Sequence, residues 1–216
     1  MNKFLIYYGG SGSIEILSYM FDAKICNDND KFLVYDEKIS KKNLKNLKKK
    51  IKKIHFIKNI NNLKKKTINY CVITSGFPVL REKALLNIKK KKIKLISIIH
   101  PLSYVSKNSI IQPGCIITPF SFIGPGAKIG TNCLINVGAR IGHNSEVGKS
   151  TVISSNSTIN GFSVIGNLNF LGTGAVVSPG VKTGNNCKIS SNSVVIKNME
   201  SRYFAHGNPA VTKKIF

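Results

Sequence analysis

The side chains of this sequence best suited to proton transfer near neutral pH are its four histidines, because an imidazole has an unperturbed pKa of about 6.5. Only His143 lies inside the repeated segment described below, in the stretch Ile141-Gly142-His143-Asn144. Its position in the repeat faces away from the apolar row, so the ring is not needed in the core. A neutral imidazole there can accept the proton of an attacking amine or hydroxyl. The alternative interpretation is a solvated residue at a corner of the fold.

A second set of candidates surrounds a glycine-rich turn. Residues 3–8 predict a buried strand and residues 14–21 a helix, and strand, glycine turn and helix form the setting in which backbone amides bind a phosphate. The dinucleotide pattern is incomplete, because Glu15 stands where a third glycine would be; a turn that binds nothing is the alternative. Doubly wound domains contact a ribose or base with an acid after the second strand. The expected ligand site consists of Gly10, Gly12, Ser13 and Asp36.

The element that must position His143 is a repeat of six residues. Residues 105–200 divide into sixteen consecutive hexads, of which fifteen begin with Ile, Val or Leu and thirteen have Ser, Thr, Ala or Cys at the fifth position. This period fits neither a helix nor a single alternating strand, but it is typical of a parallel β-helix with three hexads in each triangular coil. The exceptions are Thr183 at a first position and Asn169, Val181 and Met199 at fifth positions.

Stacked coils place residue n beside residue n + 18, about 4.8 Å away, the spacing of paired strands. Gly161 therefore lies one coil from His143. Its backbone N–H would be a donor for the oxygen of a reacting carbonyl, and the missing side chain would let a substrate approach. His143 and Gly161 share their column with Pro125 and Pro179, and His143 is the one residue of these four that titrates.

The N-terminal half predicts an alternation of strands and helices. Such an order is typical of a small α/β, Rossmann-like domain at residues 1–100, followed by the β-helix at residues 101–216. A strand closing at Ser75-Gly76 adds Gly76 to the expected acceptor site. The predicted strands are 3–8, 31–35, 54–57, 69–74 and 93–99, and the predicted helices are 14–21 and 78–90, with a basic helix or loop at 41–53.

The net charge of +24 comes mostly from residues 38–94, which hold 20 Lys or Arg and one acid, Glu82. Nucleic-acid binding is one interpretation, but almost no Arg and few aromatics favour solvated lysines instead. No run approaches the roughly 20 apolar residues of a membrane span, and the N-terminus does not read as a signal peptide. The five cysteines show no metal spacing and fit buried fillers in a reducing cytoplasm.

The hexads, the glycine-rich N-terminal half, His100-Pro101 and the tail Gly207-Asn208-Pro209-Ala210 together resemble the sialic-acid O-acetyltransferase and bacillosamine/perosamine N-acetyltransferase group. The resemblance covers essentially the whole chain. It implies a left-handed β-helix, a homotrimer with each site at a subunit boundary, and no metal. It also implies transfer of acetyl from acetyl-CoA to an amino or hydroxyl group of a sugar or nucleotide-linked sugar in surface-glycan biosynthesis.

The resemblance also implies roles for single residues. His143 matches the group's general base, with Asn144 beside it, and Gly161 the glycine that contacts the acetyl carbonyl. Asn136 matches an asparagine beside the acceptor. The implied coenzyme-binding residues are Val152, Gly161, Thr173 and Ser191.

Two residues depart from the group's pattern. Asn144 stands where the group usually has an acid, so the base is weaker, Glu146 substitutes, or the reaction has changed. Ser13 stands where the group often has histidine, which puts the nucleotide part of the acceptor in question. Both departures favour the alternative of a catalytically inactive trimeric scaffold that binds a sugar nucleotide. The inward fifth positions of Ser145 and Cys133 argue against a covalent acyl-enzyme.

Overall fold

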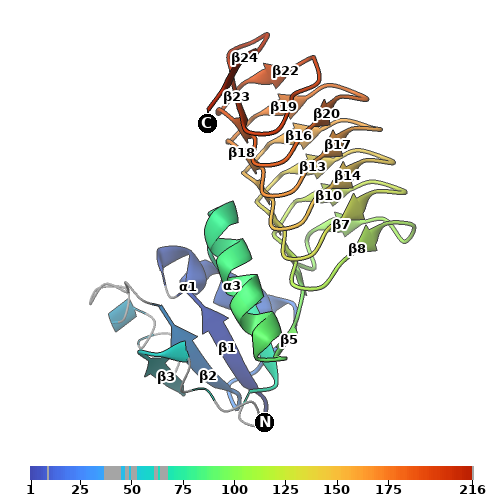
Figure 1. The fold of residues 1–216 in the computed structure, drawn as a ribbon. Coiled ribbons are helices and arrows are strands. Elements are labelled where there is room, and N and C mark those ends of the chain that lie inside the picture. The colour runs from blue at the N-terminus through green and yellow to red at the C-terminus, as the bar shows by residue number, and fades with distance from the viewer. Residues whose placement is uncertain are drawn as a thin grey trace.

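The computed structural model of this chain describes residues 1–8, 10–36, 45–46, 49, 53–60, 63 and 68–215. It contains an N-terminal parallel β-sheet with helices and a long parallel β-solenoid, whose coils form a single stack (Figure 1). The fold confirms the predicted change from an α/β part to stacked hexads.

The N-terminal elements are β1 (Lys3–Tyr7), α1 (Ser11–Asp22), β2 (Lys31–Tyr35), β3 (Ile54–Ile57), β4 (Tyr70–Ile73), α3 (Pro78–Lys90) and β5 (Lys94–Leu95). The strands are all parallel, in the order β3-β2-β1-β4-β5. Alternate residues of the central β1 enter different cores: Phe4 and Ile6 pack with α1, whereas Leu5 and Tyr7 pack with α3. Because β1 is apolar on both faces, the sheet is covered on both sides.

The solenoid confirms the predicted coil of 18 residues, since its two-residue strands pair as Ile141 with Ile159 and Val147 with Ile165. The strands are β6 (Ile98–Ile99), β7 (Tyr104–Val105), β8 (Ile110–Ile111), β9 (Ile116–Ile117), β10 (Phe122–Ile123), β11 (Lys128–Ile129), β12 (Leu134–Ile135), β13 (Arg140–Ile141), β14 (Glu146–Val147), β15 (Val152–Ile153), β16 (Thr158–Ile159), β17 (Val164–Ile165), β18 (Phe170–Leu171), β19 (Val176–Val177), β20 (Lys182–Thr183), β21 (Lys188–Ile189) and β22 (Val194–Val195). An antiparallel pair, β23 (Tyr203–His206) and β24 (Val211–Lys214), ends the stack.

One predicted strand, at residues 93–99, is divided. β5 joins the N-terminal sheet, whereas β6 pairs with β9 of the solenoid. The segment is mostly apolar, with Lys94 and Ser97 as its polar residues, so its sequence does not reveal that two sheets share it. The basic helix or loop predicted for residues 41–53 lies mostly outside the described residues.

The solenoid strands form the three sides of a prism. The first sheet contains β7, β10, β13, β16, β19 and β22, the second contains β8, β11, β14, β17 and β20, and the third runs from β6 to β21 and continues into β23 and β24. The first and second sheets meet at the corner of Pro125, His143, Gly161 and Pro179, here named the histidine corner. The third sheet lies across the prism from it. Ile116, Leu134 and Val152 of the third sheet share a core with Phe4 and Ile6 of the N-terminal sheet.

Polar contacts from α3 fix the two parts together. The buried Arg81 guanidinium donates to the carbonyl oxygens of Asn132 (2.7 Å), Ile73 (2.9 Å) and Ser75 (2.9 Å). Burial lowers the pKa of Arg81 to about 10, so the side chain stays charged at neutral pH. Arg81 thus joins the end of β4 to a solenoid corner.

The next residue of α3, Glu82, accepts hydrogen bonds from Lys149 Nζ and Ser150 Oγ, both at 2.7 Å. Burial by itself raises the pKa of Glu82, but these two hydrogen bonds and the nearby lysine charges outweigh it and lower the pKa. The carboxylate is therefore ionised at neutral pH and stabilises the contact between α3 and the solenoid.

Two exceptions to the hexad pattern are partners inside the solenoid core. Asn169 and Thr183 are both buried, and Asn169 Nδ2 donates to Thr183 Oγ1 at 2.8 Å and to the Gly184 carbonyl at 2.9 Å. Asn169 Oδ1 accepts from the Cys187 N–H at 2.6 Å. Each polar group that replaces an apolar or small residue is thus satisfied by another.

Candidate functional site

The histidine corner places the imidazole of His143 directly over Gly161. A β-carbon added to Gly161 would lie 2.5 Å from Nε2 and 2.7 Å from Cε1 of His143, so no larger residue fits unless the ring moves. The Phe162 N–H donates to the His143 carbonyl oxygen at 3.0 Å and holds the two coils in register. The structure thus brings His143 and Gly161 together, one coil apart, as the spacing predicts.

Asn144 and Phe162 flank the imidazole, which is exposed. Nδ2 of Asn144 lies 3.4 Å from Nδ1 of His143, a long contact for a hydrogen bond. The Phe162 ring stands perpendicular to the imidazole, with 4.8 Å between centroids. If the Asn144 amide turns its oxygen to Nδ1–H, the lone pair is on Nε2, the nitrogen that faces Gly161.

The backbone of Gly161 offers a donor beside Nε2. Its carbonyl oxygen accepts from the Gly180 N–H at 3.0 Å, whereas its own N–H donates to no backbone carbonyl of the described residues. A fixed N–H beside a base can stabilise negative charge that develops on a carbonyl oxygen. The corner therefore places a side chain that can act as a base beside a backbone N–H that can act as an oxyanion donor.

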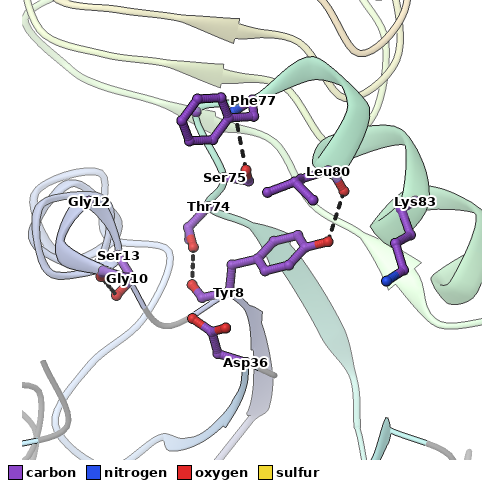
Figure 2. Close-up of a pocket in the computed structure, with 11 residues that line it drawn as sticks. Tyr8, Gly10, Gly12, Ser13, Asp36, Thr74, Ser75, Phe77, Leu80 and Lys83 are labelled. Carbon is purple, nitrogen blue, oxygen red and sulfur yellow. Dashed lines mark hydrogen bonds between the residues drawn. The ribbon is translucent and has the colours of Figure 1, made fainter. Parts of the chain in front are cut away.

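A cavity of about 510 Å³ opens in the N-terminal part, at the carboxyl ends of β1, β2 and β4 (Figure 2). The strand order reverses between β1 and β4, and ligands bind in the crevice that such a switch point leaves. The cavity is lined by five predicted acceptor residues, Gly10, Gly12, Ser13, Asp36 and Gly76.

The remaining walls of this cavity were not foreseen from the sequence. Tyr8 crosses it, and its hydroxyl donates to the Leu80 carbonyl oxygen at 3.2 Å (Figure 2). Lys83 adds a cation from α3, and Phe77 an exposed ring. The lysine-rich composition predicts that Lys83 is solvated, and the signal that distinguishes it is its place in the second turn of the helix that follows β4. Ser13 borders the cavity but is buried, and its hydroxyl donates to the Gly10 carbonyl oxygen at 2.6 Å.

The other predicted site residues lie on the solenoid away from this cavity. Thr173 and Ser191 are exposed one coil apart at the corner between the third and first sheets, and half-buried Asn136 lies at the same corner. Val152 is 1% exposed and packs in the core shared with the N-terminal sheet. Its side chain is therefore covered and does not reach the surface at His143.

The two candidate half-sites face opposite ways in one chain. The cavity belongs to the part that packs on the third sheet, whereas His143 occupies the corner opposite that sheet. Among the described residues, no three His, Cys, Asp or Glu side chains gather as a metal site. No helix in the described part of the chain has the length and apolar character needed to span a membrane.

No protein-family model matches the sequence, and no curated protein sequence matches it. Solved structures do match. A mutant of perosamine N-acetyltransferase from Caulobacter crescentus, in complex with CoA and GDP-perosamine, is 21% identical over 99% of this chain and 97% of that chain, with a TM-score of 0.85. The acetyltransferase domain of PglB from Neisseria gonorrhoeae FA1090 is 18% identical, over 99% and 100% of the two chains, with a TM-score of 0.85. WeeI from Acinetobacter baumannii AYE is 17% identical, with the same coverage and TM-score. The likeness shows that this chain shares their fold over its whole length.

Proposed function

We propose that this protein is an acetyltransferase that moves acetyl from acetyl-CoA to an amino or hydroxyl group of a nucleotide-linked sugar in surface-glycan biosynthesis. The observation that carries the proposal is the position of His143 Nε2 over the backbone of Gly161. Further support comes from the fold, since a neighbour over 99% of the chain was solved with CoA and GDP-perosamine. By the same likeness we infer a left-handed solenoid, and five free cysteines fit a cytoplasmic location.

In the proposed reaction, Nε2 of His143 accepts the proton of the acceptor group as that group attacks the acetyl carbonyl. The Gly161 N–H donates to the carbonyl oxygen while negative charge develops on it. The CoA thiolate then leaves and takes up the proton held by His143. Ser145 Oγ and Cys133 Sγ donate to the carbonyl oxygens of Asn160 and Gly148, at 2.8 and 3.0 Å, so direct transfer without an acyl-enzyme is preferred.

In this proposal the N-terminal residues 1–100 form a Rossmann-like acceptor domain, and residues 101–216 form the catalytic domain. The nucleotide lies in the cavity of Figure 2, where the N-terminus of α1 and Lys83 favour phosphate. Asp36 follows β2, where a carboxylate can accept from a ribose hydroxyl.

A homotrimer would complete the site, because one chain leaves the cavity and His143 on opposite sides. The acceptor held by one subunit would then face the histidine corner of its neighbour. Asn136, Thr173 and Ser191 lie at the other edge of the first sheet, and in the trimer they would contact the acceptor and the coenzyme from the opposite side of the subunit boundary. Exposed aromatics on the first sheet support a second copy there: Tyr104 and Phe122 stack at 5.0 Å and are 56% and 39% exposed. A monomeric mass by ultracentrifugation at micromolar concentration would contradict this assembly.

An inactive scaffold that binds a sugar nucleotide is the second candidate. The observation that favours it is Asn144, whose uncharged amide lies 3.4 Å from His143 and cannot stabilise an imidazolium as a carboxylate does.

Release of the CoA thiol from acetyl-CoA, measured against nucleotide-linked amino sugars such as GDP-perosamine and against free sialic acids, separates the two candidates. The enzyme should turn over at least one acceptor, and His143→Ala should lower kcat by about 10²–10⁴-fold with little change in coenzyme binding. Nucleotide-sugar binding without turnover would support the scaffold. Near-normal turnover by His143→Ala would end the assignment of the base.

A further inference from the structure

Phe162 is a bulky residue at a position where the backbone has positive φ. The fourth hexad positions at the histidine corner have positive φ: 69° at Gly126, 53° at Asn144, 61° at Phe162 and 71° at Gly180. Glycine and asparagine tolerate this left-handed region, whereas a bulky side chain is rarely found there. The Phe162 ring is also 60% exposed, so burial offers little compensation for the unfavourable backbone.

The ring of Phe162 contacts His143 instead. The rings are perpendicular with centroids 4.8 Å apart, an arrangement that aromatic pairs prefer. In the described part of the chain, the imidazole has one hydrogen-bond partner, Asn144 at 3.4 Å. A carboxylate would hold Nδ1 by a shorter, charge-assisted bond, so Asn144 alone restrains the ring weakly.

We propose that Phe162 is a positioning residue that holds the His143 imidazole with Nε2 directed to Gly161. The inference rests on the proposed function. Gly161 supports the imidazole from below, Asn144 contacts Nδ1, and the Phe162 ring blocks rotation on the remaining side. Bulky residues with positive φ also occur at Phe120 and Leu168, so what distinguishes Phe162 is its ring contact with the exposed imidazole of His143.

Phe162→Asn tests this role, because it places at this position the residue type found at Asn144 with the same backbone. If Phe162 positions His143, kcat should fall about 2- to 10-fold, the range for losing an edge-to-face contact. The KM for acetyl-CoA should stay within about twofold, and the melting temperature should be equal or higher. Phe162→Tyr keeps a ring and should keep kcat. Phe120→Asn, at another exposed position with φ of 60°, gives the stability change from the backbone alone.

The decisive comparison repeats Phe162→Asn in an Asn144→Asp background. A carboxylate at position 144 would hold the ring by itself, so removing Phe162 should then cost less. Equal losses in both backgrounds, full turnover of Phe162→Asn, or a variant that loses activity because its assembly dissociates would each overturn the inference. A wild-type protein without turnover on the acceptor panel would instead overturn the proposed function, and the inference with it.

Discussion

Gly161→Ala is a small change with a large predicted effect on catalysis. The added methyl carbon would lie 2.5 Å from Nε2 and 3.0 Å from Cδ2 of His143. Real carbon contacts are about 3.5–4.0 Å, so the imidazole must retreat by about 1 Å. The backbone of Gly161 does not lie in the left-handed region, so alanine fits it without strain.

The expected loss of turnover follows from this displacement of the imidazole. A misplacement of about 1 Å can reduce turnover on the order of 10²-fold, and the methyl group also crowds the N–H that would meet the carbonyl oxygen. Because the clash is with the end of a rotatable side chain, stability should change little. We therefore expect kcat to fall by about 10–100-fold, with the melting temperature within about 2 °C of wild type.

The assay is steady-state release of the CoA thiol, together with thermal unfolding of the same preparation. Gly130→Ala is a matched control on another corner, where the added carbon would lie 2.8 Å from the Lys149 backbone nitrogen and 2.9 Å from the Val147 carbonyl oxygen. There the backbone itself must shift, so stability should fall while the folded fraction keeps its turnover. A Gly161→Ala protein with the kcat of wild type would refute the assignment of His143 as base and of the Gly161 N–H as donor.

Three further predictions concern the histidine corner, the contact of α3 with the solenoid, and the cavity of the N-terminal part. Asn144→Asp should move the acidic limb of the pH–rate profile to higher pH, because a carboxylate beside His143 favours the imidazolium; an unchanged limb would contradict this. Glu82→Gln should destabilise the protein by about 1–2 kcal/mol at pH 7. Folding lowers the pKa of Glu82, so its contribution is present above the unfolded value of about 4.3 and is lost as pH falls through the lower folded value. Thermal melts of the two proteins should therefore converge only when the pH is below the pKa of Glu82 in the folded protein. Gly12→Asp, where a β-carbon meets nothing within 4 Å, should raise the KM for a nucleotide-linked acceptor but not for acetyl-CoA; equal KM values would place the nucleotide elsewhere.

Periodic features of the sequence predicted the fold well. The hexads fixed which residues pair between coils, and so the neighbourhood of His143 and Gly161. Strand ends and turns predicted the residues of the cavity, because the carboxyl ends of parallel strands meet at one edge. Neither signal depends on contacts between distant segments.

Features set by tertiary contact could not be predicted in this way. Arg81 sits in a lysine-rich helix and reads as solvated, yet it is fully buried because backbone carbonyls of both parts surround it. Val152 occupies an ordinary hexad position, and only the docking of the N-terminal sheet covers its side chain. Phe162 has no local signal beyond being a bulky residue where Asn and Gly recur.

The hydrogen-bonded pair of Asn169 and Thr183 distinguishes the two coils that it joins from all the others. The apolar rows are so alike that a coil which slid along the stack by one repeat would still bury aliphatic side chains. A slide by one hexad would place Asn169 against Val177 or Ile189 instead of Thr183 and leave its amide unsatisfied, at a cost of about 1–3 kcal/mol. The pair therefore selects one alignment of the coils, because only that alignment satisfies the hydrogen bonds of Asn169. Replacing Asn169 by alanine and Thr183 by valine should leave the melting temperature almost unchanged but make refolding multiphasic in stopped-flow traces. Single-phase refolding would show that the coils align correctly without this pair.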